Sequence, residues 1–231
     1  MKRKGEAIVS KIPPVLIAVL ICGGQAALPF SPATTPFDNK VVRVQLSAGL
    51  PGVITPPHVH LTNRVMIYFD AGTNKITYQN GKISPEVFRA GDVQWNNAMG
   101  THVAEIIAAG PVNIAHIELK SPPDMVPAVA YAALDPLKVD PGHYKMEIDN
   151  NQVRVLRLHL SRGEKTVLHE DVFERLLVPL TAGKLKTIDA AGRTKTVTYK
   201  RAQLQWLLPG KEAEENLGGQ PYEALIVEFK K

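Results

Sequence analysis

The stretch FDNKVVRVQL at Phe37–Leu46 decides the fold, because a second stretch, IDNNQVRVLR at Ile148–Arg157, resembles it closely. Shifting the chain by 111 residues, the distance from Phe37 to Ile148, superposes an Asp-Asn pair and a Val-Arg-Val triplet. The same shift aligns residues further along the chain: Gly52 with Gly163, His58 with His169, Arg64 with Arg175, Gly72 with Gly183, Gly81 with Gly192, and Trp95 with Trp206. After a one-residue deletion the matches continue, so we predict two homologous units, residues 37–120 and 148–231.

Both units are predicted to consist of β-strands. Segments such as VVRVQL, VMIYF, KITYQ and NIAHIEL alternate or cluster β-branched and aromatic residues with a period of two, and no segment carries a long apolar stripe of helical period. Asn80-Gly81 is a hairpin signal, and Ala191-Gly192 takes its place in the second unit. Short strands of this kind close into a barrel or a two-sheet jelly roll, which removes exposed edges. The predicted fold class is all-β, with two tandem barrels.

The connector between the units, residues 121–147, contains five prolines. It is long for a linker, and its AVAYAAL segment, residues 128–134, is predicted to form a short helix or an arm that packs on a barrel.

The composition excludes a nucleic-acid-binding surface. The chain has 231 residues, of which 45% are hydrophobic and 21% charged, as in ordinary folded soluble proteins. Its pI of 9.2 comes mainly from one end, because residues 1–26 hold four basic residues and one acidic residue, which leaves about +2 of the formal +5 for the remainder. That remainder is too nearly neutral to track a phosphate backbone.

Residues 1–26 are predicted to be a secretory signal peptide. A basic start precedes the apolar stretch Ile12–Ile21, and small residues then favour cleavage after Ala26. An uncleaved anchor is the alternative, and lipoprotein processing before Cys22 is disfavoured by the bulky Ile21. Because Cys22 is the single cysteine, the mature chain has no disulfide. We expect a periplasmic or secreted bacterial protein without stable membrane association after cleavage.

Two segments of the first unit resemble the motifs of the cupin family. Gly52-Val-Ile-Thr-Pro-Pro-His58-Val-His60 resembles the opening of the first motif, G-x5-H-x-H-x3/4-E-x6-G, and the segment from Gly91 to His102 resembles the second, G-x5-P-x-G-x2-H-x3-N. The chain departs from these motifs at Asn97, Met99 and Ile106, and at Arg64, which stands where the family has a glutamate ligand. The resemblance covers both units and implies a duplicated cupin, or bicupin, of two β-barrels, which often hold a divalent metal.

Three histidines of the first unit form the candidate metal site. His58 and His60 lie two residues apart, so on one strand both side chains point to the same face, and His102 could add a third nitrogen from a distant strand. Neutral imidazoles suit divalent transition metals such as Fe, Mn, Zn, Ni or Cu. The alternative is a family remnant in which these histidines hydrogen-bond to polar groups of the barrel without a metal.

An arginine recurs at the same place in both units, as Arg64 and Arg175. A guanidinium cannot be a metal ligand and repels a nearby cation unless a carboxylate or an anion offsets it. Glu105 is the predicted partner of Arg64. The arginine is present in both units, whereas the candidate metal ligands differ between them. The arginines are therefore expected to serve the fold or to bind a small anionic molecule, such as a sugar acid or an organic acid.

The second unit offers a weaker candidate site. His169 and Asp171 stand where His58 and His60 stand, and Glu212 falls where His102 was, so the three could bind a harder cation. The alternative is a solvated surface, since residues 212–216 (EAEEN) are predicted to form an exposed loop. Trp95 and Trp206 recur at equivalent positions, which favours packing over a substrate platform.

Three functions remain open from the sequence. The first is an exported metalloenzyme, which the resemblance would place among dioxygenase- or isomerase-type cupins. The second is a protein that binds a small molecule without catalysis. The third is a structural protein whose barrels associate through their faces; the resemblance implies either a homodimer or a bicupin that pairs its own two units. Metal content separates the first from the others, and the direction in which the arginines point separates the second from the third.

Overall fold

The computed structural model describes residues 33–122, 124 and 130–230. The predicted signal peptide, with Cys22, therefore lies outside the described residues. Within the described ranges, no helix is both long enough and apolar enough to span a bilayer.

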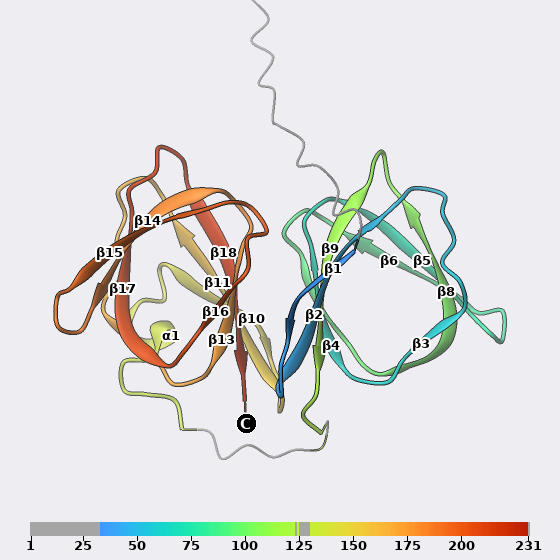
Figure 1. The fold of residues 1–231 in the computed structure, drawn as a ribbon, viewed down its shortest axis with the longest axis horizontal. Coiled ribbons are helices and arrows are strands. Elements are labelled where there is room, and N and C mark those ends of the chain that lie inside the picture. The colour runs from blue at the N-terminus through green and yellow to red at the C-terminus, as the bar shows by residue number, and fades with distance from the viewer. Residues whose placement is uncertain (1–32, 123, 125–129, 231) are drawn as a thin grey trace, which may run out of the picture.

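The first unit contains nine strands arranged in two sheets. The strands are β1 (Thr34–Asp38), β2 (Val42–Gly49), β3 (His58–His60), β4 (Arg64–Tyr68), β5 (Gly72–Tyr78), β6 (Ile83–Phe88), β7 (Val93–Asn96), β8 (Met99–Ile107) and β9 (Val112–Leu119). One sheet has the order β1-β2-β9-β4-β7 and the other the order β3-β8-β5-β6. All strand pairs are antiparallel, and the two sheets face each other as a jelly-roll barrel (Figure 1).

The second unit contains the corresponding nine strands. They are β10 (Tyr144–Asp149), β11 (Val153–Leu160), β12 (His169–Asp171), β13 (Arg175–Pro179), β14 (Gly183–Asp189), β15 (Thr194–Tyr199), β16 (Gln205–Leu207), β17 (Gly210–Asn216) and β18 (Tyr222–Phe229). Their sheets have the orders β10-β11-β18-β13-β16 and β12-β17-β14-β15, which are the orders of the first unit with every number raised by nine. The prediction of an all-β fold with two tandem barrels is confirmed.

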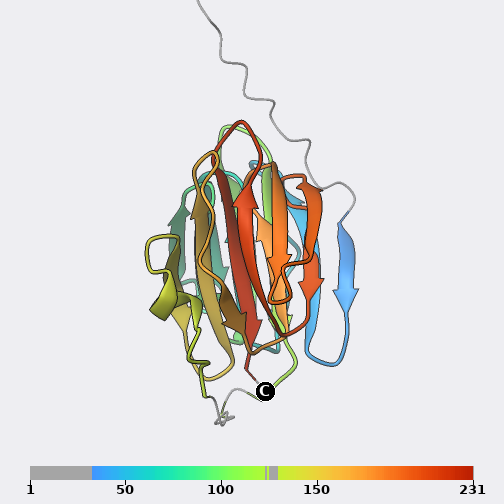
Figure 2. The same cartoon turned by 90° about the vertical axis from the view of Figure 1, so that its left-hand side faces the viewer.

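The two five-stranded sheets pack against each other and bury the largest apolar core between the barrels (Figures 1 and 2). Strand alternation explains this, because successive side chains of a strand point to opposite faces. On β4, Val65 and Ile67 face the shared core, whereas Met66 and Tyr68 belong to the core inside the first barrel. These sheets are therefore covered on both faces, and Trp95 and Trp206 pack against the shared core, as predicted for packing residues.

The hairpin predictions are confirmed. Gly81 joins β5 to β6 with a φ of +79°, and Gly192 joins β14 to β15 with a φ of +77°. Glycine adopts this left-handed backbone without a steric penalty, which is why a glycine occupies the turn in each unit.

The connector was predicted to form a short helix or an arm that packs on a barrel, and the structure shows the arm: Arg154 of the second barrel lies over the Tyr131 ring, 4.2 Å from its centroid. The described part of AVAYAAL, residues 130–134, has no helix, and the short helix α1 follows it at Pro136–Val139. Asp135 starts this helix by accepting a hydrogen bond from the backbone N–H of Leu137, and Pro136 has the fixed φ that suits a first helical residue. Asp135 also forms an ion pair with buried Arg154, at 2.6 Å, which ties the connector to the second barrel.

The prediction of an exposed loop at residues 212–216 was wrong. These residues belong to β17, which pairs with both β12 and β14. Its glutamates alternate, so Glu212 and Glu214 line the inside of the barrel while Glu215 forms an outer ion pair with Lys186. A run of acidic residues suggested solvent on every side, whereas a strand turns only alternate side chains outward.

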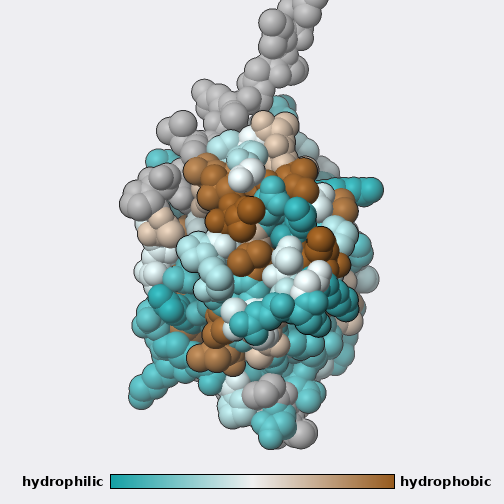
Figure 3. All heavy atoms as spheres, turned by 90° about the vertical axis from the view of Figure 1, so that its right-hand side faces the viewer, coloured by the Kyte–Doolittle hydropathy of each residue, from teal (hydrophilic) through white to brown (hydrophobic). Residues whose placement is uncertain are grey.

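The outer face of the first barrel exposes apolar side chains. Ile83, Pro85 and Val87 of β6 are exposed, as is Ile107 of β8, and apolar patches stand out on this side of the molecule (Figure 3). The equivalent exposed positions of β15 are three threonines, Thr194, Thr196 and Thr198. The apolar character is therefore a property of this barrel and not a requirement of the fold.

Candidate metal centre

The structure brings the three predicted histidines of the first unit together. His58 and His60 lie on the short strand β3, which pairs with β8 so that His58 stands opposite His102. One ring nitrogen from each histidine lies within 4.8 Å of the others, and the ring centroids are 4.4–5.2 Å apart. Among the described residues this is the one group of three or more histidine, cysteine or acidic side chains with such geometry.

Backbone contacts fix which nitrogen of two rings is free. The Nδ1 atom of His58 lies 2.9 Å from the carbonyl oxygen of Pro56, and that of His102 lies 2.7 Å from the carbonyl oxygen of Gly100. A carbonyl oxygen only accepts, so Nδ1 carries the proton in each ring and Nε2 keeps its lone pair. An imidazole anchored in this way is arranged as metal-binding histidines usually are.

Burial favours the neutral form of His60 and His102. It lowers the pKa of His60 to about 3, with a further contribution from the positive charge of Arg64, and it also lowers the pKa of His102. The Nδ1 atom of His60 lies 4.0 Å from a carboxylate oxygen of Glu118 on β9. At neutral pH these two rings therefore offer lone pairs and carry no protons that a metal would have to displace.

Arg64 points into the first barrel and lacks a partner there. Its side chain is buried, and Nε and Nη1 have no hydrogen-bond partner among the described residues. The predicted pairing with Glu105 was wrong, because Glu105 faces outward and binds Lys75 at 2.9 Å. His102 and Glu105 are three positions apart on β8, so they point to opposite faces of the strand.

Further polar groups of the first barrel are also unsatisfied. Tyr68 Oη, Asn74 Oδ1 and Asn96 Oδ1 are buried without a hydrogen-bond partner in the described structure. Buried polar groups are nearly always paired, so such a concentration in one barrel points to a bound group or to ordered water.

Sequence reasoning assigned His116 no role, yet it is one of the interior polar residues and contacts Ser47 Oγ through Nε2 at 3.0 Å. The period-two pattern of NIAHIEL was the sequence signal that could have placed His116 inside the barrel.

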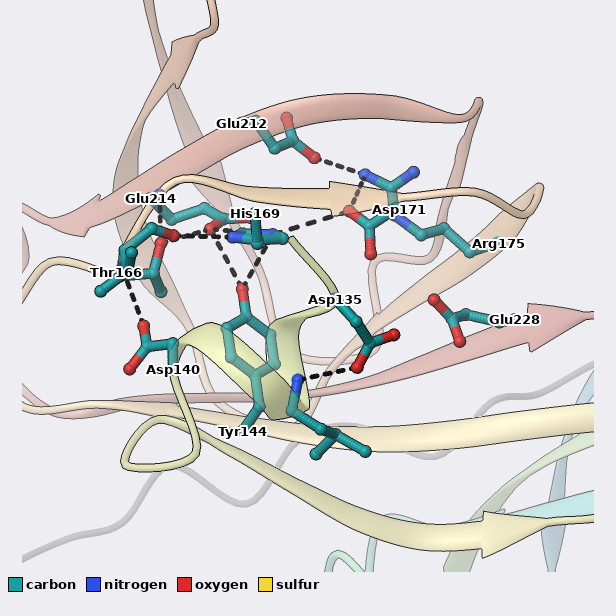
Figure 4. A network of polar contacts seen from close by, with 12 residues as sticks. Asp135, Asp140, Tyr144, Thr166, His169, Asp171, Arg175, Glu212, Glu214 and Glu228 are labelled. Carbon is teal, nitrogen blue, oxygen red and sulfur yellow. Dashed lines mark hydrogen bonds and ion pairs between the residues drawn. The ribbon is translucent and has the colours of Figure 1, made fainter. Parts of the chain in front are cut away.

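The second barrel holds its candidate residues at equivalent places, but an arginine binds two of them. His169 pairs with Glu212 across β12 and β17, as His58 pairs with His102. Arg175 Nη2 lies 2.9 Å from Asp171 Oδ2 and 2.5 Å from Glu212 Oε1 (Figure 4). Its Nη1 donates to the carbonyl oxygen of Leu208 at 2.6 Å. The guanidinium therefore supplies the positive charge that a cation would otherwise supply.

His169 retains the orientation of His58 within a different network. Its Nδ1 lies 3.0 Å from the carbonyl oxygen of Val167, while Nε2 lies 3.2 Å from Tyr144 Oη and 3.6 Å from Asp171 Oδ2 (Figure 4). Burial opposes protonation of His169, but the carboxylates of Glu214 and Asp171 outweigh it and raise its pKa. Tyr144 and Glu214 were missed by sequence reasoning, because their contacts join a strand of the first sheet to a strand of the second.

Comparison with solved structures identifies the fold. AerE from Microcystis aeruginosa superposes with a TM-score of 0.60 at 14% identity, over 84% of this chain and 90% of that one. A cupin 2 conserved barrel domain protein from Leptotrichia buccalis gives 0.53 at 15% identity, over 86% and 88% of the two chains. The fold is that of a bicupin.

A third similar structure is the oxalate decarboxylase of Bacillus subtilis, an enzyme with Mn(II) centres. It matches this chain with a TM-score of 0.57 at 12% identity, over 88% of this chain and 76% of that one. No family model matches the sequence, and no curated protein does either. At these identities the likeness extends to the fold, and the activity must be argued from the residues of this chain.

Proposed function

We propose that the first barrel of this bicupin binds a divalent transition metal through Nε2 of His58, His60 and His102. The observation that carries the proposal is the convergence of three ring nitrogens, two of them on rings whose Nδ1 is engaged by a backbone carbonyl. Three imidazoles without a carboxylate suit Zn, Fe, Ni or Cu, and the Mn(II) centres of the similar oxalate decarboxylase add Mn to the candidates.

Arg64 supports a second part of the proposal, a small anionic ligand bound beside the metal. The guanidinium has two unpartnered N–H groups, and its positive charge contributes, after burial, to the lowered pKa of His60. A carboxylate of an organic acid or a sugar acid would accept those hydrogen bonds and offset the repulsion between Arg64 and the metal. Arg64 would orient such a ligand at the metal's open positions.

A metal in this site would polarise a bound organic ligand as a Lewis acid. The residues of the chain do not select one reaction, so the proposal covers a dioxygenase- or isomerase-type enzyme and a protein that only binds its ligand. The basic and apolar pattern of residues 1–26 supports export to the periplasm or beyond, where the mature protein would meet its ligand.

The test is the metal content of the purified mature protein, measured by plasma mass spectrometry. We expect near-stoichiometric transition metal in the wild type and loss of that metal in a His58→Ala/His60→Ala variant. A His159→Ala variant, which removes an exposed imidazole of β11, is the control and should keep its metal. A wild type that stays empty after incubation with Fe, Mn, Zn, Ni and Cu would refute the metal site.

A further inference from the structure

The interior of the second barrel contains a cavity of about 250 Å³, lined by residues of β11 through β18. Six apolar residues line it: Leu158, Leu177, Leu185, Val197, Leu207 and Ile226. One end carries the carboxylates of Asp171, Glu212 and Glu214 together with Arg175. An apolar pocket with a few convergent polar groups is the usual form of a small-molecule site.

We propose that this cavity binds a small molecule that donates hydrogen bonds, an amine or an alcohol with an apolar body, and that it rejects anions. The proposal does not depend on metal binding in the first barrel, because the two sites share no residue.

Both terminal nitrogens of Arg175 are already engaged by protein acceptors, which makes it a poor anchor for an anion. Its two terminal nitrogens bind the Asp171 and Glu212 carboxylates and the carbonyl oxygen of Leu208. An incoming carboxylate would have to displace one of these contacts and would meet the negative charge of the same residues. This differs from the first barrel, where Arg64 has unpartnered nitrogens.

Asp171 supplies the atom that would hold the ligand. Its side chain is only 3% exposed, its Oδ2 is bound by Arg175, and its Oδ1 has no hydrogen-bond partner in the described structure. Because Asp171 lines the cavity, this oxygen is a buried acceptor without a donor. Leaving such an acceptor unpaired is unfavourable, so a ligand with an N–H or O–H group would gain that contact.

The charges at this end of the cavity also favour a ligand that donates hydrogen bonds. At this end three carboxylates stand beside Arg175, with His169 behind them. Asp189, Arg193 and Lys195 also line the cavity, and there Arg193 pairs with Asp189 at 2.7 Å. Glu214 accepts hydrogen bonds from Thr166 Oγ1 at 2.9 Å and Tyr144 Oη at 3.2 Å, which fixes it in place (Figure 4). The end of the cavity is therefore rich in acceptors, and a cationic amine would meet a favourable field.

The experiment compares three probes of one shape with the full mature chain: cyclohexylamine, cyclohexanol and cyclohexanecarboxylate. Binding is followed by amide chemical-shift titration, with assigned amides of Thr187, Tyr199 and Gln205 reporting on the cavity wall. We expect the amine and the alcohol to shift these amides and the carboxylate to bind at least tenfold more weakly. Equal or tighter binding of the carboxylate, or no shift with any probe, overturns the proposal.

Two variants locate the binding. In Asp171→Asn the amide oxygen should face Arg175 and the amide NH₂ should face the cavity, so amine binding should weaken at least tenfold while carboxylate binding improves. Val197→Phe fills the cavity without touching the polar end and should abolish binding of all three probes. The proposal fails if Val197→Phe leaves binding unchanged, whether or not Asp171→Asn folds. His159→Asn, at an exposed position of β11 outside the cavity lining, is the control and should leave binding of all three probes unchanged.

Discussion

Arg64 and Arg175 occupy one position in two copies of the same barrel, yet their surroundings give them opposite roles. Arg175 neutralises two carboxylates, whereas Arg64 faces three histidines and has two unpartnered nitrogens. Removing one partner of a buried ion pair is strongly destabilising, because the other charge is left without compensation. A buried charge that has no partner is itself unfavourable, because its desolvation is not offset. A pair of matched substitutions should separate the two cases.

We expect Arg175→Met to lower the free energy of unfolding by about 3–5 kcal/mol, because it leaves the carboxylates of Asp171 and Glu212 without a counterion. Arg64→Met should not lower it in the metal-free protein, since no ion pair is broken and a buried charge without a partner is removed. Urea unfolding of the two variants beside the wild type measures both. A loss for Arg64→Met as large as that for Arg175→Met would show that Arg64 has a partner in solution.

His116 should make stability depend on pH. Burial, followed by the charges of Arg64 and His58, lowers its pKa from 6.5 to about 4, and Ser47 is its hydrogen-bond partner. Between these two values the unfolded chain binds a proton that the folded protein does not bind, so stability falls as the pH drops from 6.5 to 4. At about 1.4 kcal/mol per pKa unit, the loss attributable to His116 is up to about 3 kcal/mol.

Urea unfolding at pH 7.5 and pH 4.5 measures this effect. His116→Gln, which keeps a polar side chain but cannot titrate, should lose less stability over the same range than the wild type. An identical loss in both proteins would mean that His116 is not responsible.

At the scale of strands and turns, the sequence predicted most of what the structure contains, and its errors share one cause. Both hairpin glycines and the histidine pair on one strand face were placed correctly from local rules. Glu105 and residues 212–216 were misplaced because the prediction was guided by residue type. It did not consider whether each residue stands at an inward-facing or an outward-facing position of its strand. The side of a strand that a residue faces depends on where the strand begins and with which strand it pairs, and neither is a local property.

At the scale of the whole molecule, the tandem barrels leave one apolar sheet face exposed. On β6 the exposed residues are Ile83, Pro85 and Val87, and the neighbouring strands carry the Lys75–Glu105 ion pair on the same face. In a dimer with two-fold symmetry the same patch meets itself, so lysine and glutamate of one copy could pair with glutamate and lysine of the other. We therefore expect a homodimer through this face.

Sedimentation velocity at micromolar concentration checks this expectation. The wild type should sediment as a dimer, and Val87→Lys should shift it to a monomer, because the substitution places a charge within the apolar patch. Thr198→Lys, at the equivalent position of the second barrel, is the matched control and should leave the dimer intact. A monomeric wild type, or loss of the dimer in both variants, would contradict the assignment of this face.

The sequence by itself determined the doubled all-β architecture, because period-two patterning and turn glycines act over a few residues and recur in both copies. It also named the three histidines, since residues two apart on a strand share a face. The partners of each arginine and the cavity of the second barrel became visible in the tertiary structure alone. Those features depend on which side chains from distant strands meet inside a closed barrel, and strand pairing across the fold sets that.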